Sequence, residues 1–121
     1  SFPMLWECKS LNSKSWKETV KKGLKKSKPI YAVQIALYQA YMEPSIPGIA
    51  GNPALFTAIN KDTAELHHEL IPFNAELAQR MSDRAVRILQ AAEADDLLPR
   101  IAREPDHFEC RFCDYSLRCW N

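Results

Sequence analysis

Two oppositely charged side chains interrupt an apolar stretch near the start of the chain, "MLWECK" at residues 4–9. In an extended strand successive side chains point to opposite faces, so Glu7 and Lys9 share one face. A carboxylate is a hard oxygen ligand for Mg²⁺ or Mn²⁺, and a nearby ammonium can position a water or offset negative charge. These groups are the ones that cleavage of a phosphodiester bond requires. The alternative is an edge strand with a solvated ion pair, because E-x-K tripeptides occur by chance in many proteins.

The other face of this strand carries Met4, Trp6 and Cys8. Their apolar character predicts that this face packs against the core. Cys8 is therefore expected to be buried and to play no part in binding a soft metal.

A second pair of polar groups lies about 25 residues further on, in "QIALY". Gln34 is the one strongly polar residue between Ile30 and Leu37, and Tyr38 follows it at the i+4 position, so both share a helix face. A buried glutamine needs hydrogen-bond partners. A satisfied core amide beside a packed tyrosine is the alternative to a functional pair.

The remaining pattern predicts the elements that position these groups. Ser15 and Glu18 form a capping box for a helix over 15–25. A second, nearly all-apolar helix ends before Pro44 and is followed by a loop rich in proline and glycine. A hairpin follows, with strands over 54–60 and 65–71. Asn74 is expected to cap a long helix with a continuous apolar stripe of Leu77, Met81, Ala85, Ile88 and Ala92.

This order of elements predicts an α/β fold in which helices cover a mixed sheet. The length of 121 residues fits one domain, with a core over 1–105 and a cysteine-rich tail over 106–121. No apolar run approaches the roughly 18 residues of a membrane span, and no secretory leader precedes the first strand, so a cytoplasmic protein is expected. Because the chain opens with Ser1 and enters a strand at once, we expect it to be part of a longer protein.

The tail contains three closely spaced cysteines, Cys110, Cys113 and Cys119, in the pattern C-x2-C-x5-C. This spacing can wrap a soft metal or a cluster within one short loop. His107 can complete a tetrahedral zinc site with the three thiolates. Free cysteines in an irregular tail are the third alternative.

Taken together, "WECK", a lysine-rich helix and "QIALY" resemble the PD-(D/E)xK nuclease superfamily, specifically the RecB-like exonucleases and their phage and CRISPR-associated relatives. The resemblance covers essentially the whole chain and implies a restriction-endonuclease-like core without its N-terminal part. It implies a Mg²⁺- or Mn²⁺-dependent deoxyribonuclease acting in phage or bacterial recombination and repair. Glu7 and the backbone carbonyl of Cys8 would bind the metal, Lys9 would position or activate water, and Gln34 with Tyr38 would organise the site and contact DNA.

The resemblance extends to the tail, where similar relatives hold an iron–sulfur cluster, of the [4Fe–4S] type, with a fourth cysteine from far upstream. It also shows one departure, because the family's metal site needs an aspartate on the preceding strand, and none of the six residues before Glu7 is acidic. The aspartate would lie upstream, come from another chain, or be absent from an inactive site. A non-catalytic nucleic-acid-binding or scaffolding module of the same fold, and a small zinc-stabilised interaction domain, are therefore the alternatives.

DNA is the expected partner, because a dense basic run suits phosphate contacts. A solvated helix face is the alternative explanation of this run. An exposed sheet edge would also favour pairing between chains, so a homo-oligomer is compatible with the sequence. The lysines expected to contact DNA are Lys14, Lys17, Lys21, Lys22 and Lys25.

Overall fold

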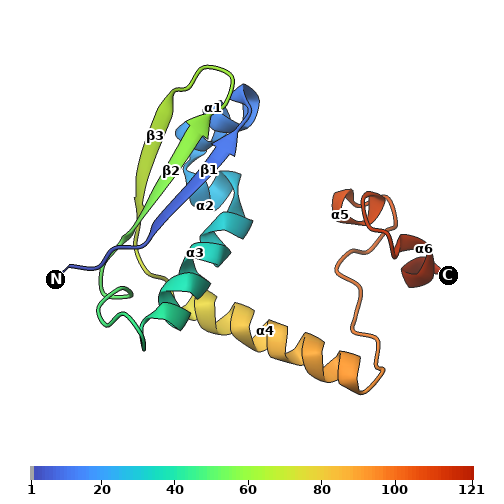
Figure 1. Cartoon of the computed structure of the whole chain (residues 1–121). Coiled ribbons are helices and arrows are strands. Elements are labelled where there is room, and N and C mark those ends of the chain that lie inside the picture. Colours follow the sequence, from blue (N-terminus) through green and yellow to red (C-terminus); the bar gives the residue numbers. More distant parts are fainter. Residues whose placement is uncertain (1) are drawn as a thin grey trace. The chain divides into compact units, whose positions relative to one another are not determined.

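The computed structural model describes residues 2–121 as an α+β fold with a mixed sheet of three strands and six helices (Figure 1). The chain forms two compact units, one up to Ala85 and one over Val86–Asn121. The elements in chain order are β1 (Trp6–Leu11), α1 (Ser13–Lys22), α2 (Leu24–Ser27), α3 (Pro29–Met42), β2 (Ala54–Asn60), β3 (Leu66–Ile71), α4 (Ala75–Glu93), α5 (Phe108–Arg111) and α6 (Ser116–Trp120).

The sheet lies in the first unit and has the strand order β1-β2-β3. β1 runs parallel to β2, so the connection between them must cross over, and α1, α2 and α3 make this crossover (Figure 1). β2 and β3 form the predicted hairpin and pair antiparallel. The predicted strand positions are confirmed to within one residue.

The face of β1 that packs against the core is the opposite of the one predicted from its apolar residues. Leu5 and Leu11 are buried, and they belong to the same face as Glu7 and Lys9. Alternation separates the faces of a strand, but it does not determine which face the crossover helices cover. The site pair therefore lies on the helix-covered face between two core leucines.

The outward face of the sheet carries the residues that were expected in the core. Trp6 is 65% exposed and Cys8 is also exposed, so the prediction that Cys8 is buried is wrong. The Trp6 indole N–H donates to Thr57 Oγ1 at 2.9 Å, and Thr57 Oγ1 lies 2.9 Å from Nδ1 of His68. His67, the neighbour of His68 in the strand, faces the opposite way and is half-buried on the helix side beside Glu69.

The first helix begins earlier than the predicted capping box. Asn12 is the N-cap, with an extended backbone, and its Oδ1 accepts a hydrogen bond from Ser15 N at 2.9 Å. Asn12 directly follows β1, where the chain is still extended, so it can cap while Ser15 is already helical. The helix over 15–25 is divided at Gly23, and Leu24 begins α2.

Gly23 adopts a backbone conformation that other residues rarely reach, with φ 79° and ψ 160°. A Cβ added there would lie 3.3 Å from Oε1 of Glu69, whose Oε2 accepts a hydrogen bond from Leu24 N at 2.9 Å. Replacing Gly23 with alanine is expected to lower the free energy of unfolding by about 1–3 kcal/mol, because this region is essentially restricted to glycine. Urea unfolding followed through the amide signals of β2 measures this effect.

Gly51→Ala is the matched control for Gly23→Ala. Its added Cβ would meet Gly48 O at 3.4 Å, an ordinary contact, and Gly51 has no positive φ. Equal stability losses in the two variants would contradict the explanation from backbone strain.

The C-terminal half of α3 is fixed to the loop before β2 by buried polar groups. Gln39, fully buried, donates from Nε2 to Ile49 O at 3.1 Å and to Asn52 O at 2.8 Å. The Glu43 carboxylate accepts hydrogen bonds from Gly48 N and Ala50 N, which lower the pKa of Glu43. These bonds determine where α3 ends relative to the start of β2.

The long helix α4 begins as predicted, since Asn74 Oδ1 accepts a hydrogen bond from Leu77 N at 2.9 Å. Its apolar stripe is not buried along its length, because Ala85, Ile88 and Ala92 are exposed. Spacing predicts a shared face, whereas burial also requires another element to pack against that face. No helix in the described part of the chain has the length and apolarity needed to cross a membrane.

Candidate active site between the first strand and the third helix

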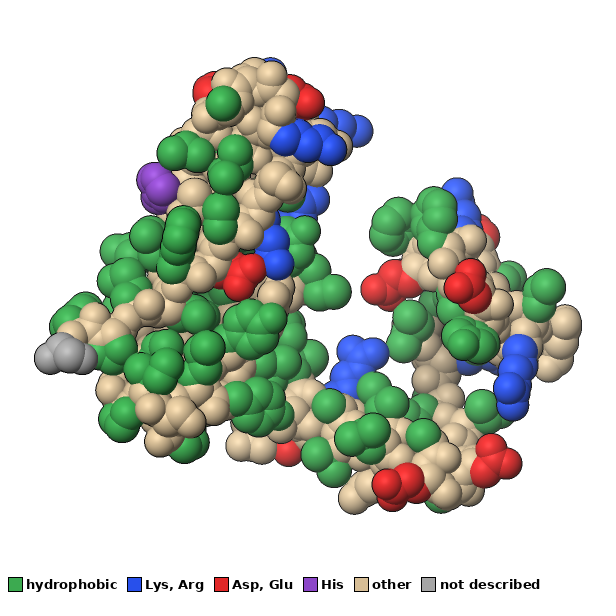
Figure 2. Space-filling view, in the orientation of Figure 1, with side chains coloured by type: hydrophobic (Ala, Val, Ile, Leu, Met, Phe, Trp, Pro, Cys, Tyr) green, Lys and Arg blue, Asp and Glu red, His purple; other side chains and the backbone are tan. Residues whose placement is uncertain are grey.

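The central feature of the site is an ion pair on the helix-covered face of β1. Lys9 Nζ lies 2.9 Å from Oε1 of Glu7, and the side chains are 25% and 13% exposed, respectively. Each has a residue of β2 beside it, Phe56 next to Glu7 and Ala58 next to Lys9, and both of these are buried. The pair is thus packed against the core yet open to a solvent-borne ligand. Figure 2 shows acidic side-chain atoms directly beside basic ones on this part of the surface.

The surroundings of Lys9 favour its ammonium form. The hydrogen bond to Glu7 is the largest cause that raises the pKa of Lys9, and partial burial opposes it. The charge of Glu7, and then Tyr31 and Tyr38 on α3, raise this pKa further. Lys9 therefore carries a positive charge at neutral pH.

Helix α3 carries the second predicted pair. Gln34 Nε2 donates to the Tyr38 hydroxyl at 2.8 Å, which confirms that the two residues share a helix face. Gln34 is half-buried and Tyr38 is 41% exposed, so neither is an enclosed core residue. The fully buried glutamine of this helix is Gln39.

Tyr31 completes the site, and the sequence reasoning did not identify it. Its ring centroid lies 5.0 Å from Lys9 Nζ, a cation–π distance. Tyr31 precedes Gln34 by three positions and Tyr38 by seven, which is the spacing of one helix face. This spacing is visible in the sequence, but a tyrosine on an otherwise apolar helix is equally compatible with packing against the core.

The oxygen atoms that could hold a hard cation lie at the open edge of β1. Leu5 O and Leu11 O accept hydrogen bonds from Leu55 N and Lys61 N, so the odd-numbered residues of β1 bond to β2. In a parallel ladder the residues between them point away from the partner strand, which directs the Cys8 carbonyl to the free edge. Lys9 engages Oε1 of Glu7, and the carboxylate has a second oxygen available to a metal.

A second carboxylate on the same face of the sheet does not join the site. Glu69 pairs with Phe56 across β2 and β3, so Phe56 lies between it and Glu7. Its Oε2 accepts the hydrogen bond from Leu24 N and lies 3.7 Å from His67 Nε2. Glu69 therefore stabilises the start of α2.

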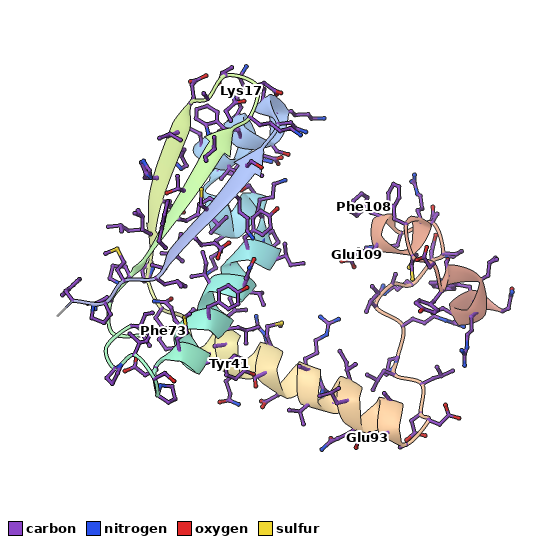
Figure 3. All side chains as sticks on the ribbon, in the orientation of Figure 1. Lys17, Tyr41, Phe73, Glu93, Phe108 and Glu109 are labelled. Carbon is purple, nitrogen blue, oxygen red and sulfur yellow. The ribbon has the colours of Figure 1, made fainter. Side chains whose placement is uncertain are left out.

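All five lysines predicted to contact DNA are exposed, four on α1 and one on α2. On the inner side of α1, Thr19 is buried and the Trp16 indole N–H donates a hydrogen bond to Ala58 O at 3.1 Å. The lysines therefore lie on the outer surface of this helix. Figure 3 shows Lys17 at the opposite end of the first unit from Tyr41. The predicted DNA contacts are Lys14, Lys17, Lys21, Lys22 and Lys25.

The three cysteines of the tail lie on or beside two short helices of the second unit. Cys110 in α5 is buried, whereas Cys113 and Cys119 are exposed. The His107 ring is engaged locally, since its Nδ1 accepts a hydrogen bond from Glu109 N at 3.3 Å. Across residues 2–121, no three side chains of His, Cys, Asp or Glu are arranged to hold a metal ion. The metal or cluster at the tail stays a prediction.

Comparison with models of known protein families, with curated proteins and with solved structures found no match to this chain.

Proposed function

We propose that this chain is a metal-dependent deoxyribonuclease domain with a RecB-like, PD-(D/E)xK core. The observation that supports the proposal is the pairing of Glu7 and Lys9 on the helix-covered side of β1, with Gln34 and Tyr38 joined on the facing helix. This ion pair lies between two core leucines of β1, where charged side chains are rarely found unless they are paired. Polar groups from two elements thus converge beside an open strand edge.

The oxygen donors at this edge fit Mg²⁺ or Mn²⁺. Glu7 and the Cys8 carbonyl would hold the ion. So few protein donors suit Mg²⁺, which usually keeps several waters and binds substrate phosphates. When bound, the ion supplies Lewis-acid activation of water and phosphate. Waters and the substrate phosphate would occupy the remaining positions around the ion, and the aspartate that the family resemblance implies is not among these donors.

The side chains then have separate roles in hydrolysis. A water oxygen forms a new bond to phosphorus and loses a proton to solvent, the bond from phosphorus to the leaving sugar oxygen breaks, and that oxygen gains a proton from solvent. The Lys9 ammonium offsets the negative charge that develops on the phosphate oxygens. The Tyr38 hydroxyl, which Gln34 orients, can donate a hydrogen bond to the DNA backbone.

The exposed lysines of α1 and α2 support DNA as the partner, through phosphate contacts. The cysteine tail would add either a [4Fe–4S] cluster or zinc, held by Cys110, Cys113 and Cys119, with His107 as the fourth ligand in the zinc case only. DNA binding by the lysines and metal binding by the cysteines can each be tested separately from the cleavage reaction at Glu7.

The decisive experiment is degradation of end-labelled linear DNA, single- and double-stranded, by the full chain with Mg²⁺, with Mn²⁺ and with a chelator. Metal-dependent cleavage is expected, and Lys9→Ala is expected to reduce its rate by about 10²-fold, the range for losing one group that stabilises transition-state charge. Lys61→Ala is the matched control, because Lys61 is an exposed lysine in the turn after β2. It is expected to keep the wild-type rate.

Equal loss in the two lysine variants would show a general effect of charge and would contradict the role of Lys9. DNA binding without cleavage by the wild-type chain would favour the alternative function, a nucleic-acid-binding module of the same fold. The exposed lysines are the observation that favours this alternative.

A further inference from the structure

The Lys9 ammonium is held from two elements at once. Glu7 Oε1 lies 2.9 Å from Nζ on the same strand, and the Tyr31 ring centroid lies 5.0 Å from Nζ on α3. An ammonium within about 6 Å of an aromatic face is attracted by the electron-rich face of the ring. Lysine has a flexible four-carbon side chain, so a single partner would leave the ammonium several positions. Two partners on different elements define one position.

We propose that Tyr31 is a positioning residue that fixes the Lys9 ammonium beside Glu7. The catalytic part of this inference rests on the proposed nuclease function. The contact between Tyr31 and Lys9 does not, and it can be tested without any reaction.

The groups around Lys9 agree with this role. Glu7 on its own strand and Tyr31 and Tyr38 on α3 all raise the pKa of Lys9, and burial only partly opposes them. The next titratable group across the sheet is His67, which lies beyond Ala58 in the same row of pairs. A charged Lys9 beside Glu7 is the form that attraction to the Tyr31 ring requires. The ammonium is then available to offset charge on the phosphate.

Two variants separate the ring from its hydroxyl. Tyr31→Phe keeps the aromatic face toward Lys9, whereas Tyr31→Leu replaces it with an aliphatic side chain. The test uses the full chain with ¹³C-labelled lysine, and the Lys9 signals are identified by their loss in Lys9→Arg. Protons above an aromatic face are shielded by the ring current, so the Lys9 Cε protons report the contact directly. The amide spectrum of β1 and β2 verifies that each variant is folded.

The wild-type chain and Tyr31→Phe are expected to show shielded Lys9 Cε protons, and Tyr31→Leu is expected to lose this shielding. Unchanged Lys9 signals in Tyr31→Leu would overturn the contact. In cleavage assays, Tyr31→Leu is expected to be roughly three- to tenfold slower than Tyr31→Phe, as loss of a cation–π contact implies.

Absence of cleavage by the wild-type chain would refute the nuclease proposal and with it the catalytic part of this inference, while the shielding would still decide whether Tyr31 positions Lys9.

Discussion

Glu7→Gln is expected to reduce metal-dependent DNA cleavage by about 10²–10³-fold, the range for removing one preorganised electrostatic group from an active site. Glutamine keeps the shape of the side chain but has no negative charge to hold a divalent cation. The Lys9 ammonium, 2.9 Å from Oε1 in the wild-type chain, would also lose its charged partner. Cleavage rates at increasing Mn²⁺ concentrations measure both losses, since weaker metal binding shifts the concentration of half-maximal rate upward.

The control for this variant is Glu65→Gln, in the exposed turn between β2 and β3. It removes an equal charge far along the chain from the site, and it should leave the Mn²⁺ dependence unchanged. A Glu7→Gln chain that cleaves DNA at the wild-type rate would exclude Glu7 as a metal ligand. The ion pair with Lys9 would then have a structural role only.

Phe56→Ala is expected to lower the free energy of unfolding by about 3–5 kcal/mol, as large-to-small changes at buried aromatic positions do. Phe56 is fully buried on the central strand, in the row between Glu7 and Glu69. Natural domains are stable by only about 5–15 kcal/mol, so this loss would leave a substantial unfolded population for a small unit. Urea denaturation followed by the amide signals of β2 measures the change.

Phe2→Ala is the matched control, because Phe2 is 74% exposed and an exposed phenylalanine loses little burial on truncation. It should change the stability by less than about 0.5 kcal/mol. Similar losses in the two variants would mean that Phe56 is not part of a tightly packed core. The first unit would then derive its stability from elsewhere.

Local patterns in the sequence predicted much of the first unit. The hairpin strands and the Asn74 cap are confirmed, because alternation and capping chemistry act over a few residues. The Gln34–Tyr38 bond is also a local feature, since i and i+4 positions meet on any helix. These interactions do not depend on how distant elements pack.

The features that the sequence did not predict depend on distant contacts. Which face of β1 is buried is decided by the side on which α1 and α3 cross the sheet, so Trp6 and Cys8 were placed on the wrong face. The choice of Asn12 over Ser15 as N-cap depends on where β1 stops. Likewise, the contact of Tyr31 with Lys9 joins residues of a helix and a strand, and no local pattern specifies such a pair.

The strict alternation along β1 has a consequence for which length changes the chain can tolerate. Along β1, side chains that belong to the site alternate with side chains on the outward face of the sheet. The strand is held in a register that pairs Trp6 with Leu55 and Leu11 with Asn60. Inserting or deleting one residue within the strand would exchange the two sets, moving Glu7 or Lys9 to the outward face. Insertions and deletions should therefore be excluded from β1 unless they come in pairs.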